Sequence, residues 1–194
     1  MNNRMLVAAA TVVCFLSLSA HAAGGAVIRD SENNRIGLEY TEGKLRVQPQ
    51  DRAEGAMIMR DGKAYVLMGD TVMDMGAMMR TFGQQAGMAP SAGPDNVSRF
   101  IALRDTGRSE SIAGISGRVH ELEYQDEDGR TQKREMVLSN DARARELAAA
   151  FKLMSDTMRD AMGKPASAED ARIHSAMQGR GILRFGQDFQ VVSF

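Results

Sequence analysis

Tight turns between short alternating segments constrain the first half of this chain more than any other feature. Glu42-Gly43, Asp61-Gly62 and Gly69-Asp70 each separate runs in which apolar and polar residues alternate. A two-residue loop of this kind joins neighbouring antiparallel strands, and its length sets which residues face each other across them. Residues 36–75 therefore predict antiparallel hairpins with a defined register.

The Glu42-Gly43 turn predicts a hairpin with one apolar face and one charged face. Its register places these residues opposite each other: Tyr40 and Leu45, Leu38 and Val47, Glu39 and Arg46, Thr41 and Lys44. The apolar residues then share one face, while Glu39 and Arg46 form an ion pair on the other. A hairpin whose two faces differ in this way favours a single register.

The next two turns predict a three-stranded meander that is rich in methionine. Its methionines and those that follow directly are Met57, Met59, Met68, Met73, Met75, Met78 and Met79. The turns place these residues opposite each other: Met59 and Ala64, Ile58 and Tyr65, Met57 and Val66, Leu67 and Val72, Val66 and Met73, Ala64 and Met75. One face of the meander therefore carries two rows, Met57-Val66-Met73 and Met59-Ala64-Met75.

Further strands follow the meander in the second half of the chain. The predicted strands span 99–104, 118–124, 131–138, 181–185 and 189–194, after a short helix at 76–87 and a loop at 89–98. Asp128-Gly129, as a two-residue turn, places Glu123 opposite Arg134.

Two longer helices are predicted between these strands. Residues 141–162 carry an apolar stripe at helical spacing, with Ser139 or Asn140 available as the N-terminal cap. The stripe consists of Leu147, Phe151, Met154, Met158 and Met162. Ser167 resembles the start of a capping box and predicts a second helix that bears Ile173 and Met177.

The N-terminus has the pattern of a signal peptide. Arg4 precedes an apolar run from Met5 to Leu18, and Ala20 and Ala22 then form an A-x-A cleavage site. The apolar run is too short for a comfortable membrane span, and no second one follows. We expect residues 1–22 to be removed and residues 23–194 to form a single periplasmic domain, with a retained membrane anchor as the alternative.

Charge and cysteine content argue against several protein classes. The chain has 24 basic and 25 acidic residues, a balance that does not favour a nucleic-acid binder or a polybasic membrane-surface protein. The single cysteine, Cys14, lies in the predicted signal peptide. The mature domain is therefore expected to depend on apolar burial, without disulfides or a thiol nucleophile.

Side chains that commonly carry catalysis or bind metals are sparse. After the predicted signal peptide the histidines are His120 and His174, which we predict to be ordinary surface or half-buried residues. No His/Cys grouping has the spacing of a zinc site, and the sequence around Ser116 is not a nucleophile elbow. We therefore predict a protein that is not an enzyme and uses no cofactor.

Strands on both sides of a helical insertion predict an α+β fold, with one curved antiparallel sheet and helices on its concave face. Three segments, "MIMRDGKAYVLMGDTVMDM", "SESIAGISGRVHELEY" and "GILRFGQDFQVVSF", resemble a family of exported bacterial proteins of unknown function that is related to the outer-membrane lipoprotein carrier (LolA-like) fold. The resemblance implies an incomplete barrel around helices, with an apolar concave surface that in carriers holds acyl chains, and no enzyme activity. Members often have a cysteine where this chain has Ser116 or Arg118, so any disulfide role does not carry over.

The methionine rows allow several interpretations. Methionine fills irregular gaps in apolar cores, and Met154, Met158 and Met162 of the predicted helix would pack against the sheet in this way. Alternatively the sheet face lines a groove for a hydrophobic ligand, formed by Met57, Met59, Ala64, Val66, Met73 and Met75. Ala64 would open that groove between two long side chains, and Ala64→Leu would obstruct it while leaving the fold largely intact.

Two further interpretations remain open. Thioether sulfur is a preferred ligand of Cu(I), and the candidate ligands are Met59, Met73, Met75 and Met78. An exposed methionine patch or an edge strand is suited instead to an envelope protein partner. The sequence favours a periplasmic binding protein for a hydrophobic molecule or an envelope component, with copper binding and a protein-partner module as alternatives.

Overall fold

The computed structural model describes residues 24–50, 55–78, 97–164 and 167–194. The predicted signal peptide, most of the predicted helix at 76–87 and most of the predicted loop at 89–98 lie outside these ranges. The described residues form eleven strands in one antiparallel sheet, in the order β6-β5-β4-β3-β2-β1-β11-β10-β9-β8-β7. The strands are β1 (Gly24–Asp30), β2 (Arg35–Thr41), β3 (Lys44–Pro49), β4 (Ala56–Arg60), β5 (Lys63–Met68), β6 (Thr71–Asp74), β7 (Arg99–Ile112), β8 (Ile115–Gln125), β9 (Thr131–Ser139), β10 (Gly181–Phe185) and β11 (Phe189–Ser193).

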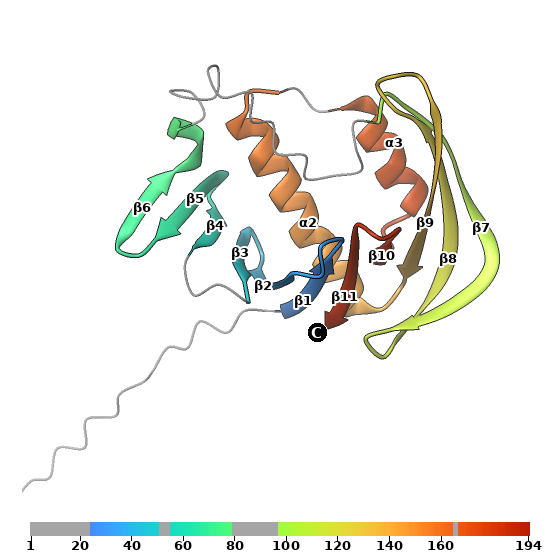
Figure 1. Cartoon of the computed structure of the whole chain (residues 1–194), viewed down its shortest axis with the longest axis horizontal. Helices are drawn as coiled ribbons and strands as arrows, with labels where there is room; N and C mark the ends of the chain where they lie inside the picture. Colours follow the sequence, from blue (N-terminus) through green and yellow to red (C-terminus); the bar gives the residue numbers. More distant parts are fainter. Residues whose placement is uncertain (1–23, 51–54, 79–96, 165–166) are drawn as a thin grey trace, which may run out of the picture.

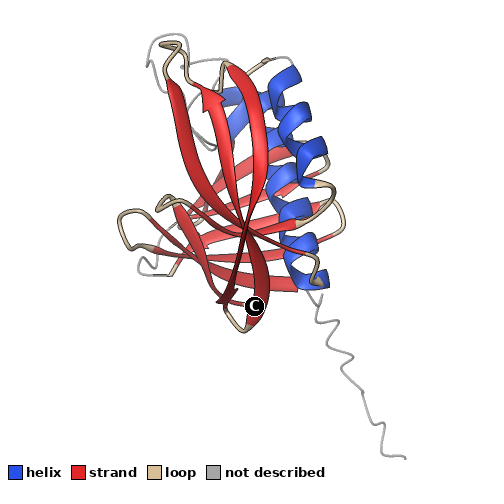
Figure 2. Ribbon diagram, turned by 90° about the vertical axis from the view of Figure 1, so that its right-hand side faces the viewer, coloured by secondary structure: helices blue, strands red, loops and turns tan. Residues whose placement is uncertain are grey.

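The sheet is open and curved, and it bends around two helices (Figure 1). These helices are α2 (Ala142–Ala161) and α3 (Ala168–Met177). Figure 2 shows both helices on the same side of the molecule, away from the outer surface of the sheet. The predicted α+β class with a curved antiparallel sheet is therefore confirmed.

The turn-based registers of the N-terminal half are confirmed. Every predicted pair of the first hairpin is present, from Tyr40 and Leu45 to Thr41 and Lys44. The meander has the predicted pairs between β4 and β5 and between β5 and β6, with one exception. β6 ends at Asp74, and Met75 begins a helical segment instead of pairing with Ala64.

The predicted register of the β8–β9 hairpin is wrong by one residue. Glu123 lies opposite Lys133, not opposite Arg134. The loop is longer than two residues because Asp126 closes it: its backbone N–H donates to the carbonyl of Arg130, and its Oδ1 accepts from the Arg130 N–H at 2.8 Å. A side chain that bonds to the backbone in this way replaces the two-residue turn.

The helix caps agree with the prediction for one helix only. Asp141, not Ser139 or Asn140, caps α2, and its carboxylate accepts from the N–H of Arg143 at 2.9 Å. Ser139 is buried, and its hydroxyl donates to the carbonyl of Ser116. Ser167 caps α3 as predicted, because its hydroxyl oxygen accepts from the backbone N–H groups of Glu169 and Asp170 in the first turn.

The core has two parts, one associated with each helix. The first combines α2 with residues from every described strand except β6, and it includes Leu38, Tyr40, Leu45, Met59, Ala64, Leu147 and Met158. The second combines β8–β10 with α3, and it includes Leu122, Tyr124, Met136, Leu138, Ile173, Met177 and Phe185. Phe189 connects the two parts, because its ring centroid lies 5.3 Å from that of Phe151 in α2 and 6.5 Å from that of Phe185.

β8 contributes to both parts by changing the face that it buries. Its buried residues are Ile115, Gly117 and Val119, followed directly by His120, Leu122 and Tyr124. Successive side chains of a strand point to opposite faces, so the two sets face opposite sides. Val119 belongs to the core part with α2, and Leu122 and Tyr124 to the part with α3. His120 is the first residue of the second set.

Gly181 allows α2 to lie directly on β10. A Cβ atom at this position would lie 2.0 Å from the carbonyl oxygen of Ala144, which is fully buried in α2. We predict that Gly181→Ala lowers the free energy of unfolding by about 1–3 kcal/mol, the usual cost of overpacking a core, and that thermal unfolding shows it as a fall in Tm.

Gly25→Ala is the matched control for this substitution. A Cβ atom at Gly25 would meet only the carbonyl oxygen of Leu38, at an ordinary contact distance of 3.5 Å. The Tm of the Gly25→Ala variant is expected to stay within about 2 °C of wild type, since a surface substitution of this kind changes the free energy of unfolding by about 0.5 kcal/mol at most. Equal losses in the two variants would contradict the role of Gly181 as a close-packing position.

Candidate functional site

The predicted ligand-binding residues lie in β4, β5, β6 and the helical segment that follows them. We call this set the methionine face; it consists of Met57, Met59, Ala64, Val66, Met73 and Met75. Met57, Val66 and Met73 are successive partners across three strands, and Met59 pairs with Ala64. The strand alternation places all of these side chains except Met75 on the face of the sheet that α2 covers.

Burial divides the methionine face into a closed row and a partly open row. Met59 and Ala64 have 0% and 1% of their surface exposed and belong to the core part that contains α2. Met57, Val66 and Met73 are half-buried. The closed row is therefore core packing, while the partly open row retains some exposed apolar surface.

The burial of Ala64 changes the expected effect of enlarging it. Ala64 lies in the same buried cluster as Leu147, Ala150 and Met158 of α2. A leucine at this position would push against the helix, so we expect Ala64→Leu to destabilise the fold by about 1–3 kcal/mol. It would test core packing rather than an open groove.

The candidate copper ligands do not share one environment. Met59 is fully buried, whereas Met73, Met75 and Met78 are half-buried in β6 and the helical segment after it. A copper ion bound to Met59 would need a path past α2. Among the described residues, no group of three or more His, Cys, Asp or Glu side chains is arranged to hold a metal ion.

His120 and His174 have different surroundings. His174 is exposed on α3, in agreement with the prediction. His120 is buried with 3% of its surface exposed, so its predicted surface or half-buried position is wrong. Its Nδ1 lies 2.9 Å from the carbonyl oxygen of Arg118, and its Nε2 lies 2.7 Å from Nη1 of Arg180.

Charged residues of β7–β10 form pairs rather than an acid–base site. Arg108 donates a hydrogen bond to Glu135 and holds the pKa of that carboxyl below its usual value, and Arg104 has the same effect on the pKa of Glu123. A general acid at neutral pH needs the opposite shift. These carboxylates are therefore suited to ion pairing at the surface of the sheet.

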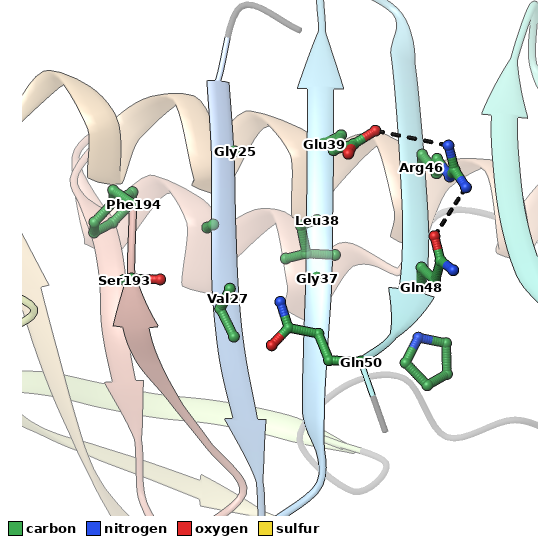
Figure 3. Close-up of a pocket in the computed structure, with 12 residues that line it drawn as sticks. Gly25, Val27, Gly37, Leu38, Glu39, Arg46, Gln48, Gln50, Ser193 and Phe194 are labelled. Carbon is green, nitrogen blue, oxygen red and sulfur yellow. Dashed lines mark hydrogen bonds and ion pairs between the residues drawn. The ribbon is translucent and has the colours of Figure 1, made fainter. Parts of the chain in front are cut away.

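A groove of about 730 Å³ lies on the opposite face of the sheet from α2 (Figure 3). We call it the outer groove; it crosses β11, β1, β2 and β3. Its lining residues are Gly25, Ala26, Val27, Gly37, Leu38, Glu39, Arg46, Gln48, Pro49, Gln50, Ser193 and Phe194. The volume is in the range of small-molecule sites.

The floor of the outer groove is bare backbone at two glycines. Gly25 pairs with Glu39, and Gly37 pairs with Gln48. The side chain of Gln50 lies over Gly37, where a Cβ atom would come within 3.6 Å of its Nε2. A glycine inside a strand is a signal for close approach of another group, and Gly37 in the segment "RIGLEYT" is the sequence signal for this groove.

Three polar side chains of the outer groove, those of Glu39, Arg46 and Gln48, contact one another. Arg46 donates a hydrogen bond to Gln48 at 2.8 Å and lies 4.0 Å from Glu39, as the hairpin register predicts. The Glu39 and Arg46 side chains are 65% and 48% exposed, so their pairing contributes little to stability. The outer groove therefore presents charged and amide side chains above its backbone floor.

None of the described helices is long and apolar enough to cross a membrane. Comparison with family models, with curated proteins and with solved structures gives no significant match. The resemblance to the LolA-like family therefore stays a prediction that is based on the three sequence segments.

Proposed function

We propose that this chain is an exported, non-enzymatic protein of the periplasm that binds a hydrophobic molecule or an envelope component on the methionine face. The observation that carries the proposal is the half-buried row Met57-Val66-Met73, which lies beside a closed apolar core. This row supplies apolar surface that a ligand would cover at a gain of about 25 cal/mol per Å².

The chemistry of the row supports a flexible apolar ligand. Met57 and Met73 flank Val66 on neighbouring strands, and methionine side chains adapt to ligands of varied shape. Met57 also packs against the buried core, so one end of the row rests on closely packed side chains. An acyl chain laid across β4, β5 and β6 would replace water on all three strands.

The proposed export is based on the N-terminal sequence. The predicted cleavage after Ala22 lies just before β1, which begins at Gly24. The resemblance to LolA-like carriers and the open, curved sheet around helices also support a carrier-like role. The mature protein would then begin at the first strand of the sheet.

Substitution of Val66 by aspartate tests the binding surface. Val66→Asp places a carboxylate in the centre of the half-buried row, and burying that charge against an acyl chain is unfavourable. We expect the Kd for a fluorescent long-chain fatty acid to rise at least about tenfold, which corresponds to about 1.4 kcal/mol. Fluorescence titration measures it.

Leu67→Asp is the control for this substitution. Leu67 is the next residue of β5, is also half-buried, and pairs with Ala56 and Val72 on the opposite face of the sheet. Its Kd is expected to stay within about twofold of wild type, once thermal unfolding shows that both variants are folded. Equal losses, or no probe binding by the wild-type protein, would contradict the proposed site.

Native mass spectrometry tests the cargo and the export together. The protein is taken from the periplasm of copper-supplemented cells, and we expect a chain that begins at Ala23 and carries an increment of lipid size. A chain that retains residues 1–22 would contradict cleavage of the signal peptide. An increment of copper size that is lost on replacing Met59 and Met75 would contradict the lipid cargo and favour the copper alternative.

A protein partner is the second candidate, because the edge of the sheet beside the methionine face is apolar. β6 pairs only with β5 in the described sheet, and Met68 at the end of β5 and Val72 within β6 are 57% and 63% exposed. An edge strand of this kind accepts a strand from another protein. An increment of protein size in the same mass spectrum would favour this function over lipid binding.

A further inference from the structure

Two glycines on neighbouring strands form the floor of the outer groove. Gly25 of β1 lies opposite Glu39 of β2, and Gly37 of β2 lies opposite Val27 of β1. The two glycines therefore occupy diagonal positions, which are about 7–8 Å apart on neighbouring strands. Val27 and Glu39 occupy the other diagonal and border the floor (Figure 3). Without side chains at Gly25 and Gly37, this part of the sheet face forms a depression.

The backbone of this floor is already hydrogen-bonded within the sheet. β1 lies between β2 and β11, β2 lies between β1 and β3, and β3 lies between β2 and β4. An extended peptide binds to a sheet at an edge strand, where backbone groups are unpaired. These interior strands therefore do not favour a peptide. They offer a flat surface on which the C–H groups of a ligand can lie.

The charged side chains that line the outer groove balance each other. They are Glu39 and Arg46, whose closest carboxylate and guanidinium atoms are 4.0 Å apart. A ligand with a net charge would be attracted by one of these side chains and repelled by the other. The groove therefore favours a polar ligand without net charge.

Four planar polar side chains surround the floor, namely those of Glu39, Arg46, Gln48 and Gln50. The hydrogen bond from Nη2 of Arg46 to Oε1 of Gln48, at 2.8 Å, orients these two side chains. Figure 3 shows the side chain of Gln50 beside Gly37. A carboxylate accepts, a guanidinium donates and an amide does both, so the set can bind hydroxyl groups as donors and as acceptors.

We propose that the outer groove binds a neutral saccharide. The C–H surface of a sugar ring lies on the floor at Gly25 and Gly37, and its hydroxyl groups face the surrounding side chains. Glu39 accepts hydrogen bonds from hydroxyl groups, and Arg46 and Gln48 donate to them. The volume of about 730 Å³ is suited to a short oligosaccharide.

This site goes beyond the hydrophobic ligand of the methionine face, because the two lie on opposite faces of the sheet. In β2 the side chain of Leu38 belongs to the core part with α2, while Gly37 and Glu39 on either side of it face the outer groove. A saccharide in the outer groove would not contact the methionine face. Either site can therefore be tested without the other.

Nuclear magnetic resonance titration tests the site with four neutral probes: maltotriose, mannotriose, galactotriose and chitotriose. At least one of them is expected to shift the backbone amide signals of Gly25, Gly37 and Gln48, with a Kd of about 1 mM or less. The free acid glucuronate is the charged comparison. Shifts caused by glucuronate and by none of the neutral probes would overturn the proposal.

Gly37→Val fills the floor. A Cβ atom at this position would meet its nearest neighbour, the carbonyl oxygen of Gln48, at an ordinary contact distance of 3.5 Å, and valine is favoured in strands. We expect the Kd for the saccharide probe to rise at least about tenfold in this variant. Its Kd for the fluorescent fatty acid is expected to equal that of wild type, which separates the outcome for this site from that for the methionine face.

Arg46→Met and its matched control, Lys44→Met, complete the test. Both substitutions remove a positive charge from the same face of β3, but only Arg46 lines the outer groove. The Kd is expected to rise at least about fivefold in Arg46→Met and to stay within about twofold of wild type in Lys44→Met, with thermal unfolding as the check on folding. No shift with any neutral probe, or equal losses in the two variants, would overturn the proposal.

Discussion

The pairing of β1 with β11 holds the two halves of the sheet together. β1 to β6 form a continuous series of neighbours at one end, and β7 to β11 form another at the other end. Among the described strands, the two series meet at the antiparallel pairing of β1 with β11, which includes Ile28 with Val191 and Val27 with Ser193. Its register shifts between Val27 and Ile28, and such a bulge increases the local bend of a strand. The curved surface around α2 and α3 therefore depends on a contact between residues at opposite ends of the described chain.

Close approach of α2 reinforces this border. Small residues let the backbone of this helix lie near the strands on both sides of the border. Gly181 in β10 lies beneath Ala144 of α2, and Ala64 in β5 belongs to the same buried cluster as Ala150 of α2. Larger residues then fill the space on either side, with Leu147 and Met158 buried among them. The methionines of this region are core residues where α2 covers them, and they offer apolar surface only where it does not. The distinction between Met59 and Met57 is thus a consequence of how far the helix reaches.

The sequence predicts well the registers that two-residue turns set, and poorly the pairings between strands that are distant in the chain. The β2–β3 and β4–β6 registers follow from turns such as Asp61-Gly62, and the stripe of α2 follows from its periodicity. β1 could not be predicted in this way, because its partner β11 lies more than 150 residues away (Ile28 and Val191 pair) and no turn connects them. The β8–β9 register failed because the Asp126 side chain closes a longer loop. For the site, the rows of the methionine face were predictable, but the burial of Ala64 and the outer groove depend on the assembled sheet.

The proposed ligand surface lies on the core part with α2, and the part with α3 meets that core along shared strands. β8, β9 and β10 contribute to both parts: Val119, Val137 and Leu183 belong to the part with α2, and Leu122, Met136 and Phe185 belong to the part with α3. Phe189 adds a side-chain contact between the two parts, because its ring centroid lies 5.3 Å from that of Phe151 and 6.5 Å from that of Phe185. A change in packing at α3 would therefore be transmitted to α2 through the backbone of these strands as well as through the aromatic contact, and the half-buried row of β4, β5 and β6 lies at the far end of that path.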